Sequence, residues 1–69
     1  MAGDEERATE LTPRIGRPAT AALTLAGYIT YASLERVSAK ELLALHGVGP
    51  KAIRILEEEL AARGLAFRR

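Results

Sequence analysis

The segment that most constrains this chain is residues 42–56, LLALHGVGPKAIRIL, in which two apolar stretches of helical period flank Gly47-Val48-Gly49. So short a connection leaves room only for a tight hairpin. Glycine at both ends of the hairpin permits positive φ and lets another molecule approach the bare main chain. Pro50 suits the first turn of the second helix because its missing N–H would have no helical partner there. The sequence therefore predicts a helix–hairpin–helix unit.

Two cations follow this proline, at the end of a helix where the macrodipole favours anions. Lys51 and Arg54 are unfavourable there in an isolated helix. A phosphate held by the N-terminal amides would make them favourable. The alternative is that Gly-Val-Gly is only a tight turn between helices, as in related domains that bind protein partners.

Length and composition exclude several classes of function. A chain of 69 residues forms one small domain, and 48% hydrophobic content, mostly Ala and Leu, favours close-packed helices. The chain has no cysteine and a single histidine, His46, which excludes disulfides, thiol catalysis and thiolate metal sites. No nucleophile–base pair, acid pair or nucleotide-binding loop is present, so we expect no enzyme activity, no cofactor and no metal. No apolar run approaches the ~20 residues of a membrane span, and the acidic start MAGDEERATE is unlike a secretory signal. These features predict a cytoplasmic protein without a membrane partner.

Local signals divide the chain into a disordered acidic tail, residues 1–11, and a folded domain, residues 12–69. Helices are expected over 18–26, ended by Gly27, over 30–36 behind a Thr30 cap, from the Ser38/Glu41 capping box to the hairpin, and over 50–63, ended by Gly64. Tyr28, Ile29, Leu65 and Phe67 are expected to pack inward, together with the inward positions of the last helix, Ala52, Ile53, Leu56 and Leu60. The apolar residues of the helix before the hairpin are Leu42, Leu43 and Leu45. Glu59 and Arg63 are spaced for an i,i+4 ion pair, and Arg54 can reach Glu57 or Glu58.

A weak internal repeat suggests two such units. Residues 15–19, IGRPA, match residues 48–52, VGPKA, with the basic residue and the proline in swapped order, and each opens a helix. We therefore expect a compact all-α bundle of four to five short helices, SAM-domain-like, in which two pseudo-twofold units place their helix N-termini side by side.

The hairpin resembles the helix-hairpin-helix family, whose pattern apolar–x–x–apolar–x–Gly–apolar–Gly–x–Lys–Ala is matched by Leu42, Leu45, Gly47, Val48, Gly49, Lys51 and Ala52. Residues 12–67 further resemble the C-terminal domain of the bacterial RNA polymerase alpha subunit. That resemblance implies a free-standing bacterial relative with a role in transcription, since the chain is too short to hold an assembly domain. It also implies contact with the DNA sugar-phosphate backbone through hairpin amides and basic residues. The family's minor-groove arginine and asparagine fall at Pro18 and Ala21, which predicts backbone contact without sequence-selective readout.

The candidate DNA-binding residues are Arg14, Gly16, Arg17, Gly47, Val48, Gly49, Lys51 and Arg54. So few cations would neutralise about three to five phosphates, giving modest, salt-sensitive affinity. Ile55 is a candidate protein contact, beside the alternative that it closes the edge of the core. Two other functions stay open: a protein–protein interaction module, in transcription or DNA repair, that kept the fold and lost DNA binding, and a structural accessory domain of a larger complex.

Overall fold

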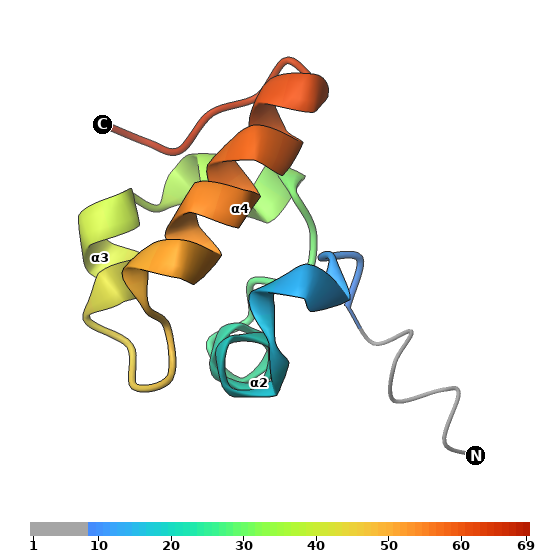
Figure 1. Cartoon of the computed structure of the whole chain (residues 1–69). Helices are drawn as coiled ribbons and strands as arrows, with labels where there is room; N and C mark the ends of the chain where they lie inside the picture. The colour runs from blue at the N-terminus through green and yellow to red at the C-terminus, as the bar shows by residue number, and fades with distance from the viewer. Residues whose placement is uncertain (1–8) are drawn as a thin grey trace.

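The computed structural model describes residues 9–69, in which three α-helices and two 3₁₀ turns are arranged without any strand. The elements in chain order are η1 (Pro13–Ile15), α2 (Arg17–Leu25), η2 (Ala32–Arg36), α3 (Ala39–Leu43) and α4 (Pro50–Ala62) (Figure 1). The expected all-α class is confirmed, whereas the bundle has fewer α-helices than the four or five expected. The first unit is the reason: the Thr12 cap and Gly16, at φ 90°, leave only three residues between them, enough for a 3₁₀ turn but not for a helix.

The helix boundaries follow the capping signals of the sequence. In α3 the Ser38 hydroxyl accepts from the Glu41 N–H (3.1 Å) and the Glu41 carboxylate accepts from the Ser38 N–H (2.9 Å), so the predicted capping box is confirmed. Thr30 and Ser33 cap one another in front of η2, since the Thr30 hydroxyl accepts from the Ser33 N–H at 3.1 Å. Gly27 follows α2 and Gly64 follows α4, and both have the left-handed φ that ends a helix (89° and 74°).

A single apolar core joins all five elements. Leu56 and Leu60 of α4 are completely buried, and α4 runs across the other helices in Figure 1. Burial of Ala52, Ile53, Leu56 and Leu60 confirms the inward face predicted for this helix. The whole core consists of Leu11, Ile15, Ala19, Leu23, Tyr31, Leu34, Val37, Leu42, Val48, Ala52, Ile53, Ile55, Leu56 and Leu60.

The expected tail boundary at residue 11 is wrong, because residues 9–11 belong to the fold. Leu11 is buried, and the Glu10 carboxylate accepts a hydrogen bond from the Tyr31 N–H at 2.9 Å. Tyr31 in turn is buried in the core, and its hydroxyl accepts from the Thr12 N–H, also at 2.9 Å. The rest of the expected tail, residues 1–8, lies outside the described residues.

Among residues 9–69, three large apolar side chains stay exposed: Leu25, Ile29 and Leu43. The expectation that Ile29 packs inward is therefore wrong. Ile29 is held through its main chain instead, because its carbonyl accepts the Glu10 N–H at 2.7 Å, and this leaves the side chain outside. Tyr28, by contrast, packs against the core as expected. None of the helices within residues 9–69 combines the length and apolar character of a membrane span.

The segment after α4 returns across the molecule and is fastened to α3. Leu65 and Phe67 pack against the core as predicted, and the Arg68 N–H donates to the Val37 carbonyl at 2.9 Å. The Arg68 guanidinium also pairs with the Glu41 carboxylate, which already caps α3. Glu41 thus connects a helix start to the C-terminal segment.

This double role predicts an acid-sensitive attachment. The hydrogen bond from the Ser38 N–H, and then that from Arg68, hold the pKa of Glu41 below its ordinary value of 4.5. Because the folded-state pKa is the lower one, the stabilisation is complete above the ordinary glutamate range and is lost as pH falls through the lowered pKa. In an amide NMR pH titration, we expect the Ser38 and Arg68 signals to shift together with a midpoint below 4.5. E41Q keeps an oxygen for Ser38 but removes the charge, so it should abolish that transition; an unchanged transition would assign it to another carboxylate.

Candidate functional site

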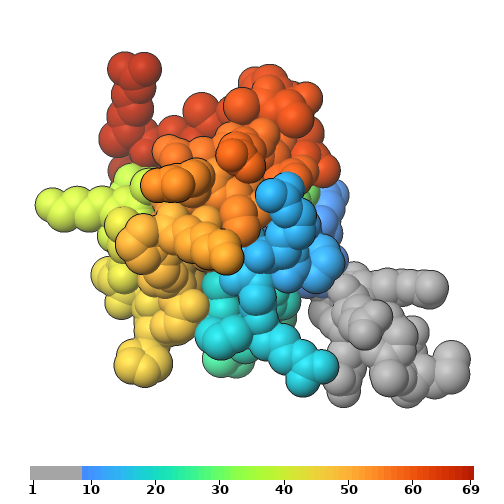
Figure 2. Space-filling model, viewed as in Figure 1, coloured from blue at the N-terminus to red at the C-terminus, as the bar shows by residue number. Residues whose placement is uncertain are grey.

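The predicted hairpin lies directly against the start of α2. A methyl group added to the Gly47 Cα would lie 2.8 Å from the Pro18 carbonyl oxygen and 3.2 Å from its carbon. Gly47 also has a φ of 99°, which L side chains rarely adopt. Its absent side chain is therefore what lets the hairpin before α4 approach the first turn of α2. The pseudo-twofold pairing of two equivalent units stays a prediction. Figure 2 shows the yellow hairpin region beside cyan α2 on one face of the molecule.

The start of α4 has free backbone donors. Gly49 is the N-cap and offers no side-chain cap, and its carbonyl accepts the first helical bond from the Ile53 N–H at 3.2 Å. Pro50 has no N–H, and the amides of Lys51 and Ala52 have no acceptor among the hydrogen bonds of residues 9–69. The first turn contains no acidic residue. These are the conditions under which a helix N-terminus binds an anion.

The start of α2 repeats these features. Its N-cap, Gly16, gives no side-chain hydrogen bond, Pro18 is in the first turn, and no acidic residue is present there. The Gly16 N–H is not free, however, because it donates to the Pro13 carbonyl at 3.0 Å. Gly16 therefore shapes the turn rather than supplying a donor.

The predicted cations divide into two groups. Arg17, Lys51 and Arg54 are exposed and form no ion pair with any acidic residue of the described range, so the expected pairing of Arg54 with Glu57 or Glu58 is absent. Arg14, on η1, instead reaches α4, where it lies 3.4 Å from Glu59 and 3.9 Å from Glu58. Glu59 also forms the predicted pair with Arg63 (2.8 Å).

The hairpin itself corrects one expectation. The Val48 amide, expected to contact phosphate, is not free, because the Val48 side chain is buried and its N–H donates to the Leu45 carbonyl at 3.2 Å, which closes the turn. The positive φ that glycine permits is not used at Gly49, which has a φ of −111°, an ordinary extended value. Gly49 also has open space where a side chain would be, so neither its φ nor its packing requires glycine.

Ile55 is not an exposed contact residue. Only 8% of it is accessible, and it belongs to the core cluster. Of the two alternatives for this position, the structure supports closure of the core and not an exposed protein contact. Because α4 packs against η1 as well as α3, its buried face is wider than a single stripe, and Ile55 lies within it.

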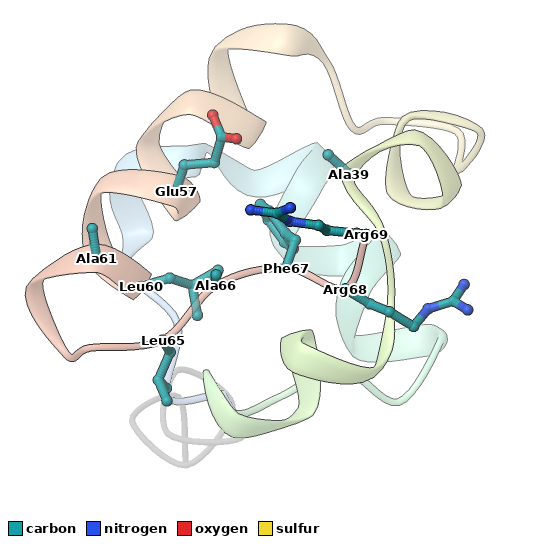
Figure 3. Close-up of a pocket in the computed structure, with 9 residues that line it drawn as sticks. All are labelled: Ala39, Glu57, Leu60, Ala61, Leu65, Ala66, Phe67, Arg68 and Arg69. Carbon is teal, nitrogen blue, oxygen red and sulfur yellow. The ribbon is translucent and has the colours of Figure 1, made fainter.

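A groove lies elsewhere, between the C-terminal half of α4 and the returning segment. It has a volume of about 400 Å³ and is mostly apolar, with Leu60, Leu65 and Phe67 in its lining and Glu57 and Arg69 as charged members (Figure 3). None of the predicted DNA-binding residues lines it. Within residues 9–69 no group of three potential metal ligands occurs.

Comparison of the chain with protein-family models, with curated proteins and with solved structures finds no match. A function for this protein is therefore inferred from the geometry of the hairpin and of the two helix starts.

The contact between Gly47 and Pro18 predicts an unusual cost for a single methyl group. Replacing Gly47 with alanine should lower the free energy of unfolding for two reasons. The left-handed backbone should cost about 1–2 kcal/mol, and overlap with the Pro18 carbonyl about 1–3 kcal/mol more. The matched control is G27A, where φ is 89° but nothing lies within 4 Å of the new methyl group. We expect thermal melts to show a clearly lower Tm for G47A than for G27A, at roughly 4–8 °C per kcal/mol. Equal melting temperatures would mean that the two helix starts do not depend on this contact.

Proposed function

We propose that this protein binds DNA through the sugar-phosphate backbone, without catalysis, at the paired starts of α2 and α4. The observation that carries the proposal is that the hairpin leading into α4 touches the first turn of α2, at Gly47 and Pro18, while both helix starts lack a side-chain cap and an acidic first turn. Each start also carries exposed basic side chains, Arg17 on one and Lys51 and Arg54 on the other. A phosphate would satisfy the free amides and remove the unfavourable interaction of these cations with the helix dipoles.

The donors available at this surface favour contact without base readout. Main-chain amides and flexible cations bind phosphate oxygens, which position a protein on a duplex but carry no sequence information. Pro18 and Ala21, which are exposed on α2, have no side-chain group able to donate to a base edge. The proposed function is therefore that of a non-specific DNA-binding domain. Because the sequence resembles the helix-hairpin-helix family and the polymerase alpha subunit domain, bacterial transcription is the first process in which to test it.

The direct test is an amide NMR titration with AT-rich and GC-rich duplexes at low and moderate salt. We expect shifts concentrated in residues 47–54 and nearly equal affinities for the two duplexes. K51E should abolish these shifts without unfolding the domain, because Lys51 is exposed.

K40E is the matched control, since it makes the same charge change on α3, whose neighbour Glu41 pairs with the C-terminal segment. It should reduce affinity much less than K51E. If residues 47–54 do not shift at low salt, or if the two variants behave alike, the proposed contact surface is wrong. A clear preference for one duplex would contradict the absence of base readout.

The number of unpaired cations at the proposed surface predicts the salt dependence. These cations are Arg17, Lys51 and Arg54, and if each releases counterions from one phosphate, the slope of log affinity against log salt is about −2.7. Affinity should then fall about 40-fold between 50 and 200 mM salt. Fluorescence anisotropy with a labelled duplex measures this slope. A slope near zero would show that phosphate contacts do not hold the complex.

The exposed face of α2 favours a second candidate, a protein–protein interaction module. Residues 18–29 contain no charged side chain, and Leu25 is 89% exposed on a domain whose other α2 leucine is fully buried. Such a face is suited to a protein contact. Duplex titrations that leave residues 47–54 unmoved would favour this candidate over DNA binding.

A further inference from the structure

Arg14 is held on α4 through one edge of its guanidinium group. Its Nη1 donates to the Glu59 Oε2 at 3.4 Å, and Glu59 is itself fixed by Arg63. The Glu59 side chain is only 25% exposed, so this pair anchors the arginine in a partly shielded place. Figure 2 shows the blue segment that includes η1 lying against orange α4.

The other edge of the same guanidinium faces a different carboxylate. Arg14 Nη2 lies 3.9 Å from the Glu58 Oε1, at the outer limit of an ion pair, and both side chains are about 60% exposed. No hydrogen bond joins the two groups among residues 9–69. An exposed pair at this distance is weak and is readily exchanged for another anion.

Glu58 also continues the row of side chains that carries the free cations. On a helix, residues three and four apart share a face, so Lys51, Arg54 and Glu58 follow one another along α4. The carboxylate therefore ends a basic row and lies beside a fourth cation, Arg14. A phosphate at that end of the row would meet two arginines if Glu58 were neutral.

From this geometry, and on the basis of the proposed DNA-binding function, we infer that Glu58 is an internal competitor of phosphate at Arg14. It limits the contact surface to three cations and thereby sets the affinity for the DNA backbone. Removing its charge leaves Arg14 anchored by Glu59, with a free edge already oriented for a phosphate oxygen. Arg14 then becomes a fourth phosphate contact.

The test measures binding of a labelled DNA duplex by fluorescence anisotropy across a range of salt concentrations. E58Q should tighten binding by about two- to fivefold, the range of one exposed ion pair, and should steepen the salt slope by about 0.9 through one added phosphate contact. E57Q is the matched control. It removes the same charge from the neighbouring position on α4, and Glu57 forms no ion pair with Arg14. It should leave the slope unchanged.

The dependence on Arg14 decides the outcome. In an R14Q background, E58Q and E57Q should change affinity equally, with circular dichroism melts confirming that every variant is folded. If E58Q matches E57Q in the wild-type background, or keeps its extra effect without Arg14, the inference is wrong while DNA binding stands. If neither the wild-type protein nor E58Q binds the duplex at low salt, the proposed function and the inference both fail.

Discussion

The arrangement of the candidate site depends on one close approach, that of the Gly47 Cα to the Pro18 carbonyl. Helices normally pack through side chains, which keep their backbones apart. Here a residue without a side chain lets the hairpin lie on the first turn of another helix, so the N-terminus of α2 lies against the segment that leads into the N-terminus of α4. Because both N-termini are positive ends of helix dipoles and carry cations, their proximity is electrostatically unfavourable in the free protein. The core beneath them, through buried Ala19, Val48 and Ala52, holds them in place.

Charge on this domain is divided along α4. The helix begins with Lys51 and Arg54 and continues with three glutamates, so its first half is basic where the dipole favours anions and its second half is acidic where the dipole favours cations. In the second half of the helix, ion pairs reduce this unfavourable interaction, because Arg14 of η1 and Arg63 at the end of α4 both pair with Glu59. At the start of the helix, Lys51 and Arg54 form no ion pair with any acidic residue among residues 9–69. An unresolved electrostatic cost confined to one end of a helix is a typical signature of a surface adapted to a ligand rather than to folding alone.

Much of the fold could be predicted because its signals are local. The Ser38/Glu41 capping box, the left-handed glycines at 27 and 64, and the apolar period of α4 each determine structure within a few residues. The errors arose where distant segments decide. Residues 9–11 belong to the fold because the Tyr31 N–H binds Glu10 from 21 residues away. Ile55, which the sequence left open between a protein contact and the edge of the core, is buried because η1 packs on a second side of α4. The same distinction applies to the candidate site. The uncapped helix starts and their cations could be predicted from the sequence, whereas the pairing of Arg14 with Glu58 and Glu59 depends on the tertiary structure.

The two glycines of the hairpin have separate meanings for anyone comparing this chain with its relatives. At position 47 the positive φ and the nearby Pro18 carbonyl disfavour any side chain, so a glycine kept there indicates only that the hairpin still packs against α2. At 49 the backbone is ordinary and the space above it is open, so the isolated domain has no packing reason to exclude a side chain. A lineage that lost its ligand would be free to vary Gly49 while keeping Gly47. The informative half of the Gly-Val-Gly pattern is therefore its second glycine.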